Sequence, residues 1–225
     1  MNLANDGAKY GADQYRFAHN YDLKNKIITI DVDGKSYSLA FAGRDRLAFD
    51  CGDGAESYDY ECLKIEDDTY FVRFGLHAAV IELHYGHATL LLSDGLLFGS
   101  ISVPMRADGG DAHKLTDDMV GTSVQWVLGS DKFVNQIYDS ADSCRAAWSP
   151  FGDKFVEYPV KCVKIKDAIY LTVITGAIPD DALPPQGSYK MIALSDYEHM
   201  LFVGCIFGKA APLMISGYGE FPDFS

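Results

Sequence analysis

The segment CLKIEDDTY, residues 62–70, returns as CVKIKDAIY at residues 162–170. The two segments are offset by one hundred residues, and they align without a gap. A tyrosine stands four positions before each of them, at Tyr58 and Tyr158. A repeat at a fixed period indicates duplicated structural units, and this period is too long for a solenoid unit. The pattern therefore predicts two small domains of the same fold.

Two weaker matches extend the repeat. The tripeptide LSD occurs at residues 92–94 and at residues 194–196, and Gly99 and Gly204 follow within apolar segments. We expect these features to occupy equivalent positions in the two domains.

Both halves of the chain carry the patterns of short strands. Residues 26–41, KIITIDVDGKSYSLAF, predict two strands around Asp33-Gly34, a dipeptide typical of two-residue hairpins. Further short apolar segments follow, separated by Gly and Asp, and they make about eight strands in each copy. A short helix over residues 9–19 is the only helical pattern. We predict an all-β protein of two antiparallel β-barrels related by internal duplication, because closure removes exposed strand edges.

This pattern also sets the expected domain boundaries. Residues 1–21 form an N-terminal extension, residues 22–103 the first barrel, residues 104–118 a linker and residues 119–225 the second barrel. The linker is rich in Gly and Asp, so it is interpreted either as a simple connection or as a flap over a barrel end. The insertion at residues 178–188 is the other candidate lid.

Composition indicates a folded, acidic protein. Hydrophobic residues make up 48% of the 225 residues and aromatic residues 13%, which is enough for a sizeable core. The formal net charge of −13 predicts repulsion from nucleic acid and from anionic membranes, although solubility alone is a sufficient reason for it. We expect a small-molecule ligand, no nucleic-acid partner and no membrane partner, and a homo-oligomer is left open.

The expected location is the cytoplasm. The N-terminal residues lack the apolar core of a signal peptide, and no segment approaches the roughly 20 apolar residues of a membrane span. The five cysteines are odd in number and form no CxxC pair, so neither a disulfide framework nor a zinc ribbon is expected.

Several stretches resemble a known family. Residues 138–179 and 191–208 resemble the C-terminal domain of the molybdenum-cofactor-biosynthesis protein F (MoaF) family, and residues 23–41 and 58–74 resemble its N-terminal domain. The resemblance implies calycin, or lipocalin-like, barrels, and phenolic acid decarboxylases have a similar barrel. Those families often carry a W-x-E pattern, where this chain has YFVRFGL and YLTVITG, and an E-H-x-Y motif, of which only Tyr138 is present.

Common catalytic and cofactor motifs are missing from the sequence. It contains no P-loop, no GxGxxG and no HExxH, so no cofactor is expected. His84 and His87 are three positions apart, and residues at that spacing in a strand point to opposite faces. We therefore expect no metal site.

The remaining candidate chemistry lies in the first copy. Arg73 interrupts an apolar strand, and a buried guanidinium is suited to clamping a carboxylate or an enolate. Glu82 and His84 share one strand face, and tyrosine hydroxyls can protonate a substrate without a cofactor. If these side chains point inward, the predicted catalytic set is Tyr60, Arg73, Glu82 and His84, with Tyr58 and Phe71 as ligand contacts. The alternative is an ordinary outer face, because periodicity cannot choose between the faces.

In the second copy, Trp126, Tyr138 and Trp148 are interpreted as an aromatic ligand pocket or as plain core. The first functional hypothesis is a cofactor-independent lyase or isomerase acting on a small aromatic or conjugated substrate. The alternative is a non-catalytic ligand carrier, accessory protein or scaffold, which the MoaF resemblance would link to molybdenum cofactor biosynthesis. An enzyme should place ionisable groups deep in a barrel, whereas a carrier should have a mostly apolar interior.

Overall fold

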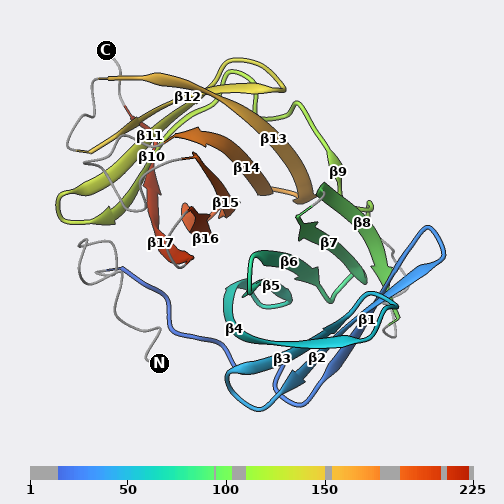
Figure 1. Cartoon of the computed structure of the whole chain (residues 1–225). Helices are drawn as coiled ribbons and strands as arrows, with labels where there is room; N and C mark the ends of the chain where they lie inside the picture. Colours follow the sequence, from blue (N-terminus) through green and yellow to red (C-terminus); the bar gives the residue numbers. More distant parts are fainter. Residues whose placement is uncertain are drawn as a thin grey trace. The chain divides into compact units, whose positions relative to one another are not determined.

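Every regular element that the structure describes is a β-strand (Figure 1). The structure is a computed structural model that describes residues 15–93, 95–102, 110–149, 154–177, 188–208 and 212–222. The expected helix does not form over residues 15–19, and residues 9–14 lie outside the described residues. Within the described part of the chain, no helix is long and apolar enough to cross a membrane.

The chain divides into two compact units. Ala18–Lys114 make the first, and the described residues from Leu115 onward make the second together with residues 15–17. The start of the chain thus belongs to both units: the backbone N–H of Phe17 donates to Ser216 Oγ at 2.8 Å, whereas Asn20 N–H donates to the carbonyl of Cys62 at 2.7 Å.

The first unit is a closed antiparallel barrel of eight described strands, blue to green in Figure 1. Each strand pairs with the next along the chain, and β8 closes the barrel on β1. The strands are β1 (Ile27–Val32), β2 (Lys35–Ala42), β3 (Arg46–Asp50), β4 (Ala55–Glu66), β5 (Thr69–Phe74), β6 (His77–Glu82), β7 (His87–Leu92) and β8 (Gly95–Ile101).

The second unit repeats this plan. Its strands β10 to β17 form a closed antiparallel sheet, and the short β9 pairs with β13. The strands are β9 (Lys114–Leu115), β10 (Ser123–Gly129), β11 (Lys132–Tyr138), β12 (Ser143–Trp148), β13 (Val156–Lys166), β14 (Ile169–Ala177), β15 (Ser188–Asp196), β16 (Leu201–Phe207) and β17 (Leu213–Glu220). The all-β fold of two duplicated barrels is therefore confirmed.

Strand registers define which residues of the two barrels correspond. Cys62 pairs with Val72 on β5, and Cys162 pairs with Thr172 on β14. Cys62 and Cys162 are therefore taken as equivalent. From them, the pairing of each strand with its neighbours shows that β1 corresponds to β10 and β8 to β17.

The same registers correct two of the sequence matches. Leu92 ends β7, whereas residues 194–196 end β15, which corresponds to β6. The counterpart of Gly99 is Gly217 and not Gly204, because the two residues face the same place on the first strand of their barrels. A Cβ on Gly99 would lie 2.5 Å from the carbonyl oxygen of Asp31, and one on Gly217 would overlap the carbonyl of Val127. A side chain fits at neither position.

One end of each barrel is crossed by the segment that precedes its first strand. In the first barrel, Asn20 N–H donates to β4 and Asn25 N–H donates to β2, and Leu23 between them is fully buried in the core cluster. In the second barrel, Thr116 and Gly121 make the equivalent hydrogen bonds, and Met119 is buried in the place of Leu23. We call this the plugged end of each barrel.

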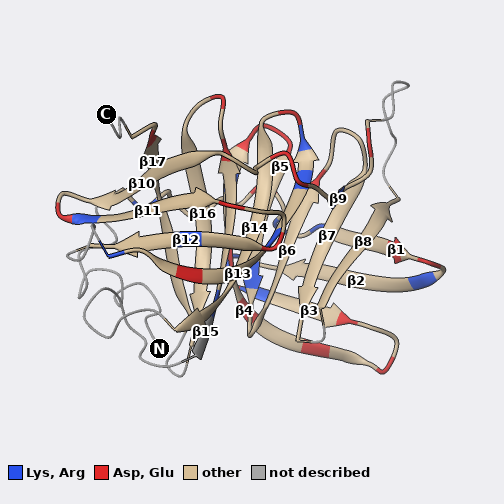
Figure 2. Cartoon of the chain, turned by 90° about the horizontal axis from the view of Figure 1, so that it is seen from above, with Lys and Arg blue, Asp and Glu red and all other residues tan. Residues whose placement is uncertain are grey.

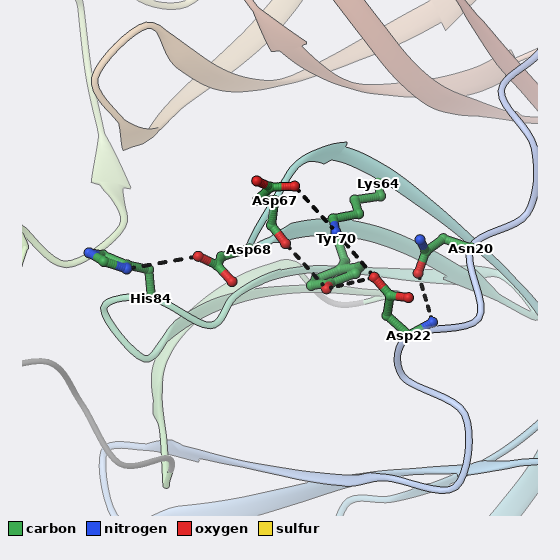
Figure 3. A network of polar contacts seen from close by, with 7 residues as sticks. All are labelled: Asn20, Asp22, Lys64, Asp67, Asp68, Tyr70 and His84. Carbon is green, nitrogen blue, oxygen red and sulfur yellow. Dashed lines mark hydrogen bonds and ion pairs between the residues drawn. The ribbon is translucent and has the colours of Figure 1, made fainter.

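The repeated motif of residues 62–70 holds the plug in place (Figure 3). Lys64 Nζ lies 3.1 Å from Asp22 Oδ2, and the Tyr70 hydroxyl donates to the same oxygen at 3.3 Å. In the second barrel, Lys164 Nζ lies 3.2 Å from Asp118 Oδ2, and the Tyr170 hydroxyl donates to the same oxygen at 3.3 Å. The repeated lysine and tyrosine thus make the same clamp on the plug of each barrel.

Residues 104–109 of the expected linker lie outside the described residues, and residues 116–118 belong to the plug of the second barrel. Residues 110–113 pack beside the turn between β6 and β7, near the plugged end of the first barrel. There, His113 Nδ1 and Thr89 Oγ1 lie 2.8 Å apart, and burial lowers the pKa of His113 to about 3, with a further contribution from His87. Residues 178–187 of the candidate lid also lie outside the described residues, and Ser188 begins β15. Figure 2 shows many of the acidic residues at turns and strand ends.

Candidate functional site

Strand alternation decides which side chains face the interior of each barrel. In the first barrel, the core cluster draws on all eight strands, so its members point inward; they include Tyr60 and Cys62 on β4, Val72 and Phe74 on β5, and Ala79 and Ile81 on β6. The residues between them on the same strands therefore point outward.

The four predicted catalytic residues are not brought together. Tyr60 points inward, where its ring packs edge-on against Phe41 at 5.2 Å between centroids, and burial raises its pKa to about 12. Arg73 lies on the outer face of β5 and is 5% exposed. Its Nη2 lies 3.1 Å from Glu61 Oε1 on the adjacent strand. The prediction that Arg73 points inward is therefore wrong. Successive residues of a strand point to opposite faces, and Arg73 lies on the face opposite to that of Tyr60.

Glu82 and His84 have roles at the plugged end. The Glu82 carboxylate accepts the backbone N–H groups of His84 and Tyr85, both at 2.8 Å, and so caps the turn between β6 and β7. His84 Nδ1 lies 3.8 Å from Asp68 Oδ2 (Figure 3). Asp196 caps the matching turn of the second barrel, accepting from the N–H groups of Glu198 and His199. A turn cap present in both copies is a feature of the fold.

The two predicted ligand contacts of the first barrel also separate. Phe71 is fully buried on the outer face of β5, next to Arg73. Tyr58 points inward at the end opposite the plug, where its ring lies against Gly75.

The second barrel places polar groups deep in its interior. Trp126, Tyr138 and Trp148 all belong to its core cluster and are at most 2% exposed. Gln136 joins two of them: its Oε1 accepts from Trp126 Nε1 and from the Tyr138 hydroxyl, both at 3.1 Å. Thr172 lies between inward residues of β14 and is also buried.

Two N–H donors in this interior lack a hydrogen-bond acceptor among the described residues. They are Gln136 Nε2 and Trp148 Nε1. Leaving a buried donor unsatisfied costs about 1–3 kcal/mol, so each is a place where an additional acceptor would be stabilising.

The interior is neutral. Burial raises the pKa of the Tyr138 hydroxyl well above its ordinary value, and it raises the pKa of both the Cys144 and Cys162 thiols to about 12. In the described part of this barrel, the buried polar side chains that face the core are uncharged, since Asp196 lies in its turn. The described side chains of this interior can therefore bind and orient a ligand through uncharged donors and acceptors.

The first barrel carries apolar residues at the corresponding positions. The registers match Ile30 with Trp126, Leu39 with Gln136, Phe41 with Tyr138 and Val72 with Thr172. The barrel therefore closes without these polar groups, and the fold does not explain their presence in the second copy.

Sequence reasoning identified the aromatic residues of this interior but missed Gln136. The signal was present in the segment NQIY, residues 135–138, where one polar residue of the strand shares the face of Tyr138.

No protein-family model matches the chain, and no curated protein matches it. Among the described residues, no group of three or more His, Cys, Asp or Glu side chains is arranged to hold a metal ion.

Proposed function

We propose that the second barrel binds a small, neutral, aromatic or conjugated molecule in its interior and that the protein is a ligand carrier. The observation that carries the proposal is the pair of buried donors, Gln136 Nε2 and Trp148 Nε1, without acceptors among the described residues. A ligand with a carbonyl or ether oxygen would satisfy a donor that the protein leaves unpaired.

The ring system of the ligand follows from its surroundings. Trp126 makes an edge contact with Tyr197 at 5.4 Å between centroids and a tilted contact with Phe202 at 5.2 Å. Aromatic side chains in such arrangements favour a planar, polarisable guest.

The neutrality of the ligand follows from electrostatics. An anion placed beside uncharged buried groups loses its hydration and gains no ion pair, at a cost of several kcal/mol. A neutral carbonyl avoids that cost. The inward tyrosine and cysteine side chains described for the second barrel stay uncharged near neutral pH, because burial raises their pKa, and this favours the carrier over the lyase or isomerase. A link to molybdenum cofactor biosynthesis rests on the sequence resemblance alone.

Intrinsic fluorescence tests the proposal directly. The chain has two tryptophans, and both lie in this interior, so a change in their emission reports on the second barrel only. We expect 4-hydroxyacetophenone to quench the emission saturably and 4-hydroxybenzoate, an anion of similar size, to bind at least about tenfold more weakly.

The matched variant is Gln136→Leu. It introduces a leucine, the residue at the corresponding position of the first barrel, Leu39. It should fold and bind the ketone about three- to tenfold more weakly, the value of one neutral hydrogen bond. Gln125→Leu, the same change on the outer face of the neighbouring strand, should leave affinity unchanged. Equal affinity for ketone and carboxylate, or equal affinity of the two variants, would refute the proposal.

A further inference from the structure

The end of the first barrel opposite its plug gathers aromatic rings. Phe49 and Phe74 pack at 5.2 Å between centroids, and His77 lies 6.0 Å from Phe49, 5.5 Å from Phe74 and 5.9 Å from Tyr58. Tyr37 stacks on Phe49 at 6.3 Å. Five strands, β2 to β6, each contribute one ring, and we call the five residues the aromatic rim.

A carboxylate stands beside these rings. Glu56 precedes Tyr58 by two positions on β4, so both point to the same side of the strand, and the Tyr58 hydroxyl donates to Glu56 Oε2. This hydrogen bond is the main reason that the pKa of Tyr58 is raised. Glu56 is exposed, whereas Tyr58 and His77 are half-buried, so a solute can reach the carboxylate and the neighbouring rings together.

The fold does not require this combination. At the positions that correspond to Glu56, His77 and Phe49, the second barrel carries Val156, Met191 and Ala146. Tyr37 likewise corresponds to Val134. Only Tyr58 has the same residue at its corresponding position, Tyr158. Tyr158 packs on Gly176 as Tyr58 packs on Gly75. The tyrosine–glycine contact is therefore part of the barrel, and the remaining rings and the acid are specific to the first copy.

The chemistry of this rim favours a cation. Aromatic faces carry negative electrostatic potential and attract ammonium groups within about 6 Å, and a carboxylate adds an ionic attraction. The cluster already lies next to one cation of the chain itself, because Lys35 Nζ lies 5.1 Å from the centroid of the Tyr37 ring. The formal net charge of −13 raises the local concentration of cations further.

From these observations we propose that the aromatic rim and Glu56 form a binding site for a small organic ammonium ion. The methylated or alkylated ammonium group lies against the rings of Tyr58 and His77, and the Glu56 carboxylate balances its charge. This site is separate from the ligand proposed for the second barrel, and each can fail without the other.

The test compares choline with 3,3-dimethylbutan-1-ol, its uncharged isostere in which carbon replaces nitrogen. Proton NMR follows the methyl resonance of each probe as the full chain is added. We expect the choline methyl signal to shift upfield saturably, because ring currents shield protons above an aromatic face, with a Kd in the millimolar range or tighter. The isostere should bind at least about tenfold more weakly.

Two charge-matched variants complete the experiment. Glu56→Gln should weaken choline binding about fivefold or more, while Asp131→Asn, which removes one exposed acid from the turn between β10 and β11, should change it less than about twofold. Far-UV circular dichroism verifies that both variants are folded. The proposal is overturned if choline causes no saturable shift at about 50 mM, if the isostere binds equally well, or if the two variants behave alike.

Discussion

Truncation of the plug in the second barrel should destabilise it strongly. Met119 is 4% exposed and belongs to the core cluster that includes Trp126 and Tyr138. Met119→Ala removes the part of the side chain that fills the plugged end. Buried Met→Ala substitutions cost about 2–5 kcal/mol, since the lost transfer free energy is increased by the cavity left behind.

The expected shift in urea unfolding follows from that cost. With a urea dependence of about 2 kcal/mol/M, a loss of about 3 kcal/mol lowers the unfolding midpoint by about 1.5 M. Tryptophan emission is the appropriate probe, because both tryptophans lie in the barrel that Met119 plugs.

The control lies next to the plug. Val120 is 46% exposed, so Val120→Ala should shift the midpoint by less than about 0.3 M. A Met119→Ala midpoint close to that of Val120→Ala would refute the assignment of residues 116–121 as a plug. Leu23→Ala is the corresponding change in the first barrel, and a loss of similar size is expected by circular dichroism.

Three further results are expected. Gly217→Ala should destabilise the second barrel, because the new methyl group would overlap a backbone carbonyl on β10; the urea midpoint measures the loss. Arg73→Ala should lower the free energy of unfolding by about 1–3 kcal/mol, since it removes the guanidinium that pairs with the half-buried Glu61 carboxylate; an unchanged thermal midpoint would contradict the ion pair. The pKa of Asp22 is lowered, chiefly by its hydrogen bond with Lys64, so its stabilising contribution is present above its ordinary pKa of 3.8 and is lost as pH falls through the lower value of the folded state. Asp22→Asn should therefore flatten the acid limb of the stability profile below about pH 4, and an unaltered profile would argue against the clamp.

The clamp gives a structural reason for the repeated segment. Lys64 and Tyr70 hold Asp22, and Lys164 and Tyr170 hold Asp118, so the same short sequence secures the plug of each barrel. The polar groups of the two barrels nevertheless differ. The second barrel has Gln136 and Thr172 in its interior, whereas the first has Glu56 and His77 at its aromatic rim.

Local sequence was sufficient for the fold class. Strand length, hairpin dipeptides and the ungapped repeat of residues 62–70 act over a few neighbouring residues, and they predict two barrels of short antiparallel strands. The same patterns marked Trp126, Tyr138 and Trp148 as inward aromatic residues, and the core cluster contains all three.

Only the tertiary structure decided which face of a strand points inward and which residues correspond. Every residue of β5 is buried, so the apolar alternation that would separate the two faces is missing around Arg73. Leu92 and Leu194, which begin the two LSD tripeptides, lie on strands that do not correspond, because register depends on hydrogen bonds between segments distant in sequence. The proposed ligand site rests on the correspondence between Leu39 of the first barrel and Gln136 of the second. For the same reason, only the strand registers establish that correspondence.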